Sequence, residues 1–94
     1  MSEPVIESSG NVFTDLGFEP AEAAILKMRA DLLNDLRVHL EQSGLTPPEM
    51  AERLGITPAR VVALLRGDWE KFSLEILITL GTRAGRRVSL KLVS

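Results

Sequence analysis

Residues 46–67, TPPEMAERLGITPARVVALLRG, decide the fold of this 94-residue chain. The stretch contains two segments that each begin with a Thr–Pro pair and end at a Gly, 46–55 and 57–67. A Thr hydroxyl can cap a helix, and Pro is tolerated in the first turn because its missing N–H has no helical partner there. Glycine is common just after the last helical residue. We therefore expect two short helices, about 46–54 and 57–66, joined by a tight turn at Gly55.

Two short helices that meet at a tight turn need a small residue at their contact and apolar residues that fix the second helix. Ala51, Gly55 and Val61 meet these needs in the required order. The apolar residues that fill the core around them are Met50, Leu54, Ile56 and Leu64. The stretch therefore predicts a helix-turn-helix motif, whose second helix enters the major groove in DNA-binding proteins.

The face of this second helix that lies opposite Val61 and Leu64 is unusually apolar for a surface that contacts DNA. Thr and Arg side chains can bond phosphates or base edges, and Ala and Val can touch thymine methyl groups. Few side chains here can form paired hydrogen bonds to a base, so we expect modest base discrimination. The candidate DNA-binding residues are Thr46, Thr57, Pro58, Ala59, Arg60, Val62, Ala63 and Arg66.

Further helices should frame the motif. Apolar residues recur every three or four positions from Pro20 to Ser43, which predicts one long amphipathic helix. Its apolar stripe comprises Ile25, Met28, Leu32, Leu36 and Leu40, widened by Leu26 and Leu33. A last helix should begin after Ser73 and reach about Ala84, and residues 11–18 can form one helical turn on the core.

Two single residues outside the motif also have expected roles. Trp69, the only tryptophan, should be a packing or interface anchor. His39, the only histidine, is expected to be a solvated helix residue, because it cannot assemble a metal site alone.

The end of the chain has the period of a β-strand. Val88, Leu90 and Leu92 alternate with Ser89 and Lys91. No second strand is evident, and a lone strand leaves its backbone donors and acceptors unpaired. The same strand of another copy, or the sheet edge of a different protein, could pair with these donors and acceptors. We therefore predict that Val88, Leu90 and Leu92 form a dimerisation strand.

The predicted fold is all-α, a small helix-turn-helix bundle of four to five helices with a short C-terminal β-strand paired across a dimer. Its parts are an acidic N-terminal arm over 1–18 that is partly disordered, a DNA-binding domain over 19–85, and the dimerisation strand over 86–94. Charge follows this division. Residues 1–23 contain five acidic side chains and no Lys or Arg, whereas residues 83–94 contain four basic side chains and no acid.

Composition excludes several classes of protein. The chain has no Cys, which excludes a disulfide scaffold and a Cys-based zinc site and fits a reducing cytoplasm. It has no Gly-rich phosphate loop and no recognisable Ser-His-Asp arrangement, so we expect neither an enzyme nor a cofactor or metal site. No signal peptide and no membrane-spanning run are evident, so we expect a cytoplasmic protein that does not enter a membrane.

From residue 11 onward the chain resembles small helix-turn-helix proteins of the Xre class, and in particular the HigA-type antitoxins of bacterial toxin–antitoxin modules. The resemblance rests on the order of NVFTDLGF (11–18), LGITPARVVALLRG (54–67) and FSLEILITLGTRAGRRVSLKL (72–92). The chain departs from the family pattern at Pro47 and Pro58, where Gln is common, at Val62 and Ala63, where polar residues are common, and at Asp68, where Lys is common.

The resemblance implies a homodimer that binds double-stranded DNA, represses its own operon and holds a ribonuclease toxin inactive. A twofold axis places the two recognition helices one DNA turn apart, so the operator should be palindromic. The acidic arm would contact the toxin, and the candidate toxin-binding residues are Val12, Phe13, Leu16 and Phe18.

Two other functions fit the same residues. One is a protein–protein docking module that has lost DNA binding and uses Pro58, Ala59, Val62 and Ala63 as an apolar patch. The other is a phage-type repressor, which shares the DNA step and has no toxin partner. The effect of removing Arg66 on DNA binding distinguishes the docking module from both repressors.

Overall fold

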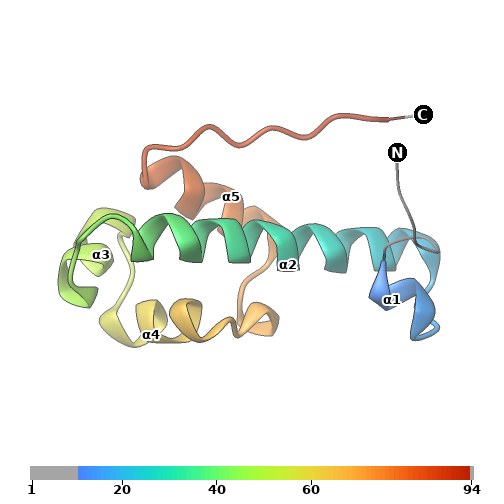
Figure 1. Ribbon diagram of the computed structural model, residues 1–94, viewed down its shortest axis with the longest axis horizontal. Coiled ribbons are helices and arrows are strands. Elements are labelled where there is room, and N and C mark those ends of the chain that lie inside the picture. Colours follow the sequence, from blue (N-terminus) through green and yellow to red (C-terminus); the bar gives the residue numbers. More distant parts are fainter. Residues whose placement is uncertain (1–10, 94) are drawn as a thin grey trace.

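A computed structural model describes residues 11–93, which form five α-helices and one 3-10 turn around one hydrophobic core (Figure 1). The elements are α1 (Val12–Asp15), α2 (Pro20–Glu41), α3 (Pro47–Leu54), α4 (Pro58–Arg66), η1 (Trp69–Lys71) and α5 (Leu74–Arg83). The predicted helical bundle is confirmed. The disorder predicted within the N-terminal arm concerns residues 1–10, which lie outside the described residues.

The long helix α2 is the frame of the fold and contacts α1, α4, η1 and α5. It begins at Pro20, where the carboxylate of Glu19 accepts the backbone N–H groups of Ala21 and Glu22. Figure 1 shows α4 below α2 and α5 above it. The predicted helix is confirmed, although it ends at Glu41 rather than Ser43.

The buried face of α2 differs from the predicted stripe. Its buried residues are Ala23, Leu26, Leu33, Leu36 and Leu40. Ile25 and Met28 remain 49% and 42% exposed, so their predicted place in the core is wrong. The helix carries apolar residues on two adjacent faces, and a single small core can cover only one of them.

Local capping defines α3 and α4 as the sequence predicts. Oγ1 of Thr46 accepts the N–H of Glu49 at 3.4 Å, and Oε1 of Glu49 accepts the N–H of Thr46 at 2.8 Å, which completes a capping box. Oγ1 of Thr57 accepts the N–H of Arg60 at 3.2 Å. The helices end at Gly55 and Gly67, whose φ angles of +72° and +83° suit glycine.

The turn of the motif is tied to α5 by an arginine. Nη1 of Arg83 donates to the carbonyl oxygen of Leu54 at 2.9 Å, and this oxygen belongs to the last residue of α3. A cation is favourable at a helix C-terminus, because the last carbonyl groups there lack partners. The contact therefore fixes the position of the turn relative to α5.

The C-terminal segment leaves α5 and runs back toward the N-terminal end of α2 (Figure 1). Val88 packs over Gly81, where an added Cβ would lie 2.9 Å from Val88 Cγ2. The predicted strand is not present in residues 86–93 of the single chain, because a strand requires a hydrogen-bonded neighbour. Leu90 and Leu92 are exposed.

His39 is not the solvated residue that the sequence predicts. It is half-buried, and its Nε2 lies 3.3 Å from the carbonyl oxygen of Ala84 at the end of α5. The ring therefore joins α2 to the C-terminus of α5.

We predict that Gly55→Ala lowers the free energy of unfolding by about 1 kcal/mol more than Gly44→Ala does. Both glycines have positive φ, at +72° and +79°, so Ala carries a similar backbone penalty at either site. A Cβ on Gly55 would lie 2.9 Å from Nη1 of Arg83, whereas a Cβ on Gly44 meets nothing within 4 Å. Ala at residue 55 therefore displaces Arg83 from its hydrogen bond to Leu54, and urea titration measures the loss.

The control for this prediction is the same pair of glycine variants in an Arg83→Met background. Without the guanidinium, the two substitutions should have similar costs. A difference of the same size in that background would show that Arg83 is not the cause.

Candidate nucleic-acid interface

The outer surface of α4 is the candidate interface. Val61 and Leu64 are fully buried and hold the inner face of the helix against the core. The structure leaves the opposite face open, and its exposed residues are Thr57, Pro58, Ala59, Val62 and Arg66. Val62 is 44% exposed, and Ala63 is half-buried. Most of the residues predicted for DNA binding are thus brought together on one helix and its N-cap.

The two capping threonines differ in what they can offer a phosphate. Thr57 accepts one backbone N–H, and its hydroxyl can still donate. The hydroxyl of Thr46 instead donates to the carboxylate of Glu49 at 3.1 Å. Hydrogen bonds from the backbone and side chain of Thr46 hold the pKa of Glu49 below its ordinary value, so this carboxylate is ionised at neutral pH. A phosphate at Thr46 would therefore meet a negative charge, which makes Thr57 the better donor.

Arg60 lies in a different place from the other candidates. Its guanidinium carbon is 4.7 Å from the ring centroid of Phe72, and its Nη2 donates to the carbonyl oxygen of Lys71 at 3.5 Å. Phe72 is fully buried, and Arg60 is half-buried above it. In the free protein this side chain therefore packs on the segment after α4, and a DNA contact by Arg60 stays a prediction.

An aromatic cluster lies next to the motif and includes Trp69. The ring of Phe13 meets that of Trp69 edge to face, with centroids 5.5 Å apart and an interplanar angle of 76°. Phe13 meets Phe18 in the same manner at 6.0 Å. The guanidinium carbon of Arg29 lies 5.2 Å from the Trp69 ring centroid. The predicted packing role of Trp69 is confirmed.

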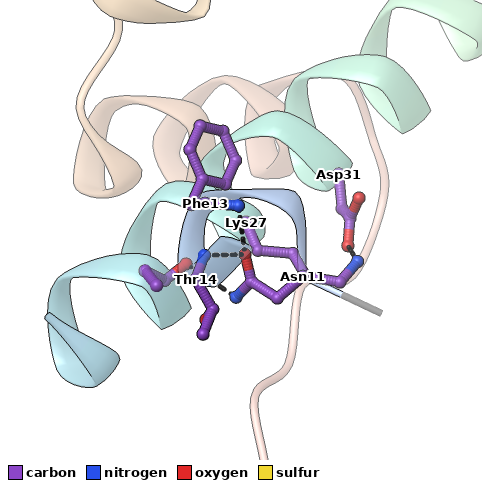
Figure 2. Close-up of polar contacts among 6 residues, drawn as sticks. Asn11, Phe13, Thr14, Lys27 and Asp31 are labelled. Atoms are coloured by element: carbon purple, nitrogen blue, oxygen red, sulfur yellow. Dashed lines mark hydrogen bonds and ion pairs between the residues drawn. The ribbon is translucent and has the colours of Figure 1, made fainter. Parts of the chain in front are cut away.

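Of the four residues that were predicted to bind a toxin, one packs on Trp69 in this cluster and the others are more exposed. Val12 and Leu16 are exposed, and Phe18 is partly so at 39%. Phe13 is half-buried because it packs on Trp69. The side chain of Asn11 caps α1 by accepting the N–H groups of Phe13 and Thr14 (Figure 2). Only part of the predicted set is therefore free to contact another protein.

The cationic side chains around the motif form two groups: one bonds backbone carbonyl groups, and the other is exposed to solvent. Arg29 and Arg83 donate to backbone carbonyl groups of the segment that runs from α3 to α5. Arg53 and Arg66 are exposed on α3 and α4. Lys71 is exposed and lies 3.9 Å from Asp68. Sequence patterns do not reveal the first group, because each of its bonds joins residues at least 29 positions apart.

Other kinds of site find no support in residues 11–93. The described part of the chain holds no group of three His, Asp or Glu side chains that could bind a metal ion. None of its helices is both long and apolar enough to cross a membrane.

The fold and the exposed outer face of α4, the second helix of the motif, define a helix-turn-helix protein. Residues 12–92 match a family model described as a helix-turn-helix domain, which covers all five helices. The chain belongs to this helix-turn-helix family. Membership supports a DNA-binding regulator of transcription. A comparison with curated proteins gave no match.

We predict that Arg60→Ala lowers the free energy of unfolding by about 1 kcal/mol, because it removes the cation above Phe72 and the bond to Lys71. Arg66→Ala is the matched control on the same helix, and its effect should stay within about 0.5 kcal/mol because its side chain is exposed. Urea denaturation measures both values. Equal stability of the two variants would show that Arg60 does not pack on Phe72 in solution.

Proposed function

We propose that this protein is a homodimeric transcriptional regulator, an antitoxin that represses its own operon and neutralises a ribonuclease-type toxin. The observation that carries the DNA-binding step is the open outer face of α4 in a helix-turn-helix domain. Buried Val61 and Leu64 fix the helix from behind. The exposed residues on its other side can enter a major groove without any rearrangement of the core.

The chemistry of this face sets the kind of contact it makes with DNA. Pro58, Ala59 and Val62 offer methyl and methylene groups that can meet thymine methyls, and Arg66 offers a cation for a phosphate or a guanine edge. Each paired hydrogen bond to a base is worth about 1–3 kcal/mol of discrimination, and this face has few groups that form them. Specificity therefore depends on shape, on methyl contacts and on the spacing of two half-sites.

Dimerisation through the C-terminal segment supplies that spacing. Residues 86–93 are extended beyond α5, and Leu90 and Leu92 expose apolar side chains to water. Pairing with the same segment of a second copy would give the backbone N–H and C=O groups hydrogen-bond partners and would cover these side chains. A twofold dimer places its two recognition helices about 34 Å apart on a palindromic operator.

The antitoxin role rests on the resemblance to HigA-type proteins and on the N-terminal segment. Val12, Leu16 and Phe18 present apolar side chains around α1, in the acidic part of the chain. Such a surface fits a basic, apolar groove on a partner protein.

We predict that Arg66→Ala weakens DNA binding and reduces the magnitude of the salt slope by about one unit, because one phosphate contact is lost. Lys27→Ala is the matched control. Lys27 bonds Asp31 at 2.7 Å on α2 (Figure 2), away from the motif, so its removal should leave the slope unchanged. Fluorescence anisotropy with DNA from upstream of the gene, at several salt concentrations, measures both. An unchanged slope for Arg66→Ala would contradict the proposed contact.

A protein-docking module is the second candidate function, and the observation in its favour is the apolar outer face of α4. If that face binds a protein, Val62→Glu should abolish partner binding and Arg66→Ala should do little. In the DNA-binding function both substitutions weaken binding to the operator, because both side chains face the groove. The two variants together therefore separate the two functions.

We predict that replacing Leu90 and Leu92 together by Gln shifts the protein from dimer to monomer, because the exposed side chains that the dimer would cover become polar. The matched control replaces Ser89 and Lys91 by Gln, which changes the alternate positions of the same segment. Sedimentation equilibrium should give twice the 10.3 kDa chain mass for the wild type and the control. A monomeric wild type would contradict dimerisation.

A further inference from the structure

The first helix, α1, is short and packs chiefly against α2. It has four residues, and none of them is fully buried. The side chain of Asn11 ties its start to α2 by donating to the carbonyl oxygen of Ala23 at 3.0 Å (Figure 2). Beyond α2, the ring of Phe13 meets that of Trp69 edge to face. A segment with so little buried surface can open locally while the core remains folded.

Trp69 lies three residues after Arg66, the last residue of the recognition helix α4. Gly67 is the C-cap of α4, and η1 begins two residues later at Trp69. Arg29 holds this segment from α2, since its Nη2 donates to the carbonyl oxygen of Trp69 and its Nε donates to that of Phe72, both at 3.0 Å. The same guanidinium lies over the Trp69 ring, so Phe13 and Arg29 both restrain it.

The contacts continue from η1 back to α4. Phe72 follows η1 directly, and its buried ring lies under the guanidinium of Arg60. Nη2 of Arg60 also donates to Lys71 at the end of η1. Phe13, Trp69, Arg29, Phe72 and Arg60 thus form an unbroken series of contacts from α1 to the recognition helix.

From this series we infer that α1 positions the recognition helix, so that DNA affinity depends on whether α1 is docked on Trp69. Phe13 is the positioning residue, and it acts through Trp69 and η1 without touching DNA. The inference rests on the proposed DNA-binding function. It goes beyond that function by giving α1 a second role and by fixing the sign of the effect: release of α1 weakens DNA binding.

Linkage makes the effect reciprocal and limits its size. If docking of α1 raises DNA affinity by some factor, bound DNA must favour docked α1 by the same factor. The loss of affinity on removing Phe13 cannot exceed the factor by which its contact with Trp69 favours the docked state. For one edge-to-face aromatic pair this corresponds to a change of about three- to tenfold in the dissociation constant. A protein that captures the exposed side of α1 and pulls Phe13 from Trp69 therefore lowers DNA affinity as well.

The test compares Phe13→Ala with Thr14→Ala in the full chain. Thr14 is the next residue of α1 and its side chain is exposed, so its removal should leave DNA affinity unchanged. Phe13→Ala should weaken binding to the upstream DNA by about three- to tenfold, with an unchanged salt slope because no phosphate contact is lost. Phe13→Tyr keeps the aromatic edge and should restore affinity. Measurements well below the unfolding temperature exclude a loss of folded protein as the cause.

Hydrogen exchange in the absence of DNA provides a second readout. Phe13→Ala should accelerate exchange of the amides of Gly67, Asp68 and Phe72, whose N–H groups bond carbonyl groups in and after α4. Thr14→Ala should not. Unchanged exchange at these amides would overturn the inference whether or not the protein binds DNA. Wild-type affinity in Phe13→Ala, with DNA binding intact, would overturn it as well and leave the proposed function standing.

Discussion

The burial of Phe72 is the constraint on which the presentation of the recognition helix depends. Its ring is fully buried directly after η1, and it supports Arg60 of α4 on one side. Its carbonyl oxygen accepts Nε of Arg29 from α2. Together with buried Val61 and Leu64, these contacts fix the inner face of α4. Because the inner face is fixed, the outer face is free to contact DNA or another partner.

Three arginines of this protein, Arg29, Arg60 and Arg83, make contacts within the fold. Arg29 and Arg83 each bond backbone carbonyl groups far away in the sequence, and Arg60 stacks on an aromatic ring. A chain with net charge −2 therefore has few free cations beside its recognition helix, among them Arg53 and Arg66. Strong nonspecific attraction to phosphates is not the basis of such an interface. In the proposed DNA complex, apolar contacts in the groove therefore supply much of the binding energy.

The parts of the fold that follow from local chemistry were predictable from the sequence. Thr46 and Thr57 cap α3 and α4 where they were expected, because capping depends only on residues three positions away. The pairing of Arg83 with Leu54 was not predictable, since it depends on how α5 packs against the turn. The second apolar face of α2, at Ile25 and Met28, gave the same periodic signal as the buried one. Which face becomes the core is decided by tertiary packing.

The candidate site was predictable as a helix and not as an arrangement of side chains. Sequence alone places Arg60 beside Arg66 on one surface, whereas the structure holds Arg60 on Phe72. The most direct test of the account is the affinity of the protein for DNA from upstream of its own gene, compared with a scrambled fragment over a range of salt concentrations. Tight, salt-sensitive binding that prefers the native fragment is the predicted result. Equal and weak binding to both fragments would contradict a DNA-binding regulator and direct attention to Val62 as part of a protein-docking surface.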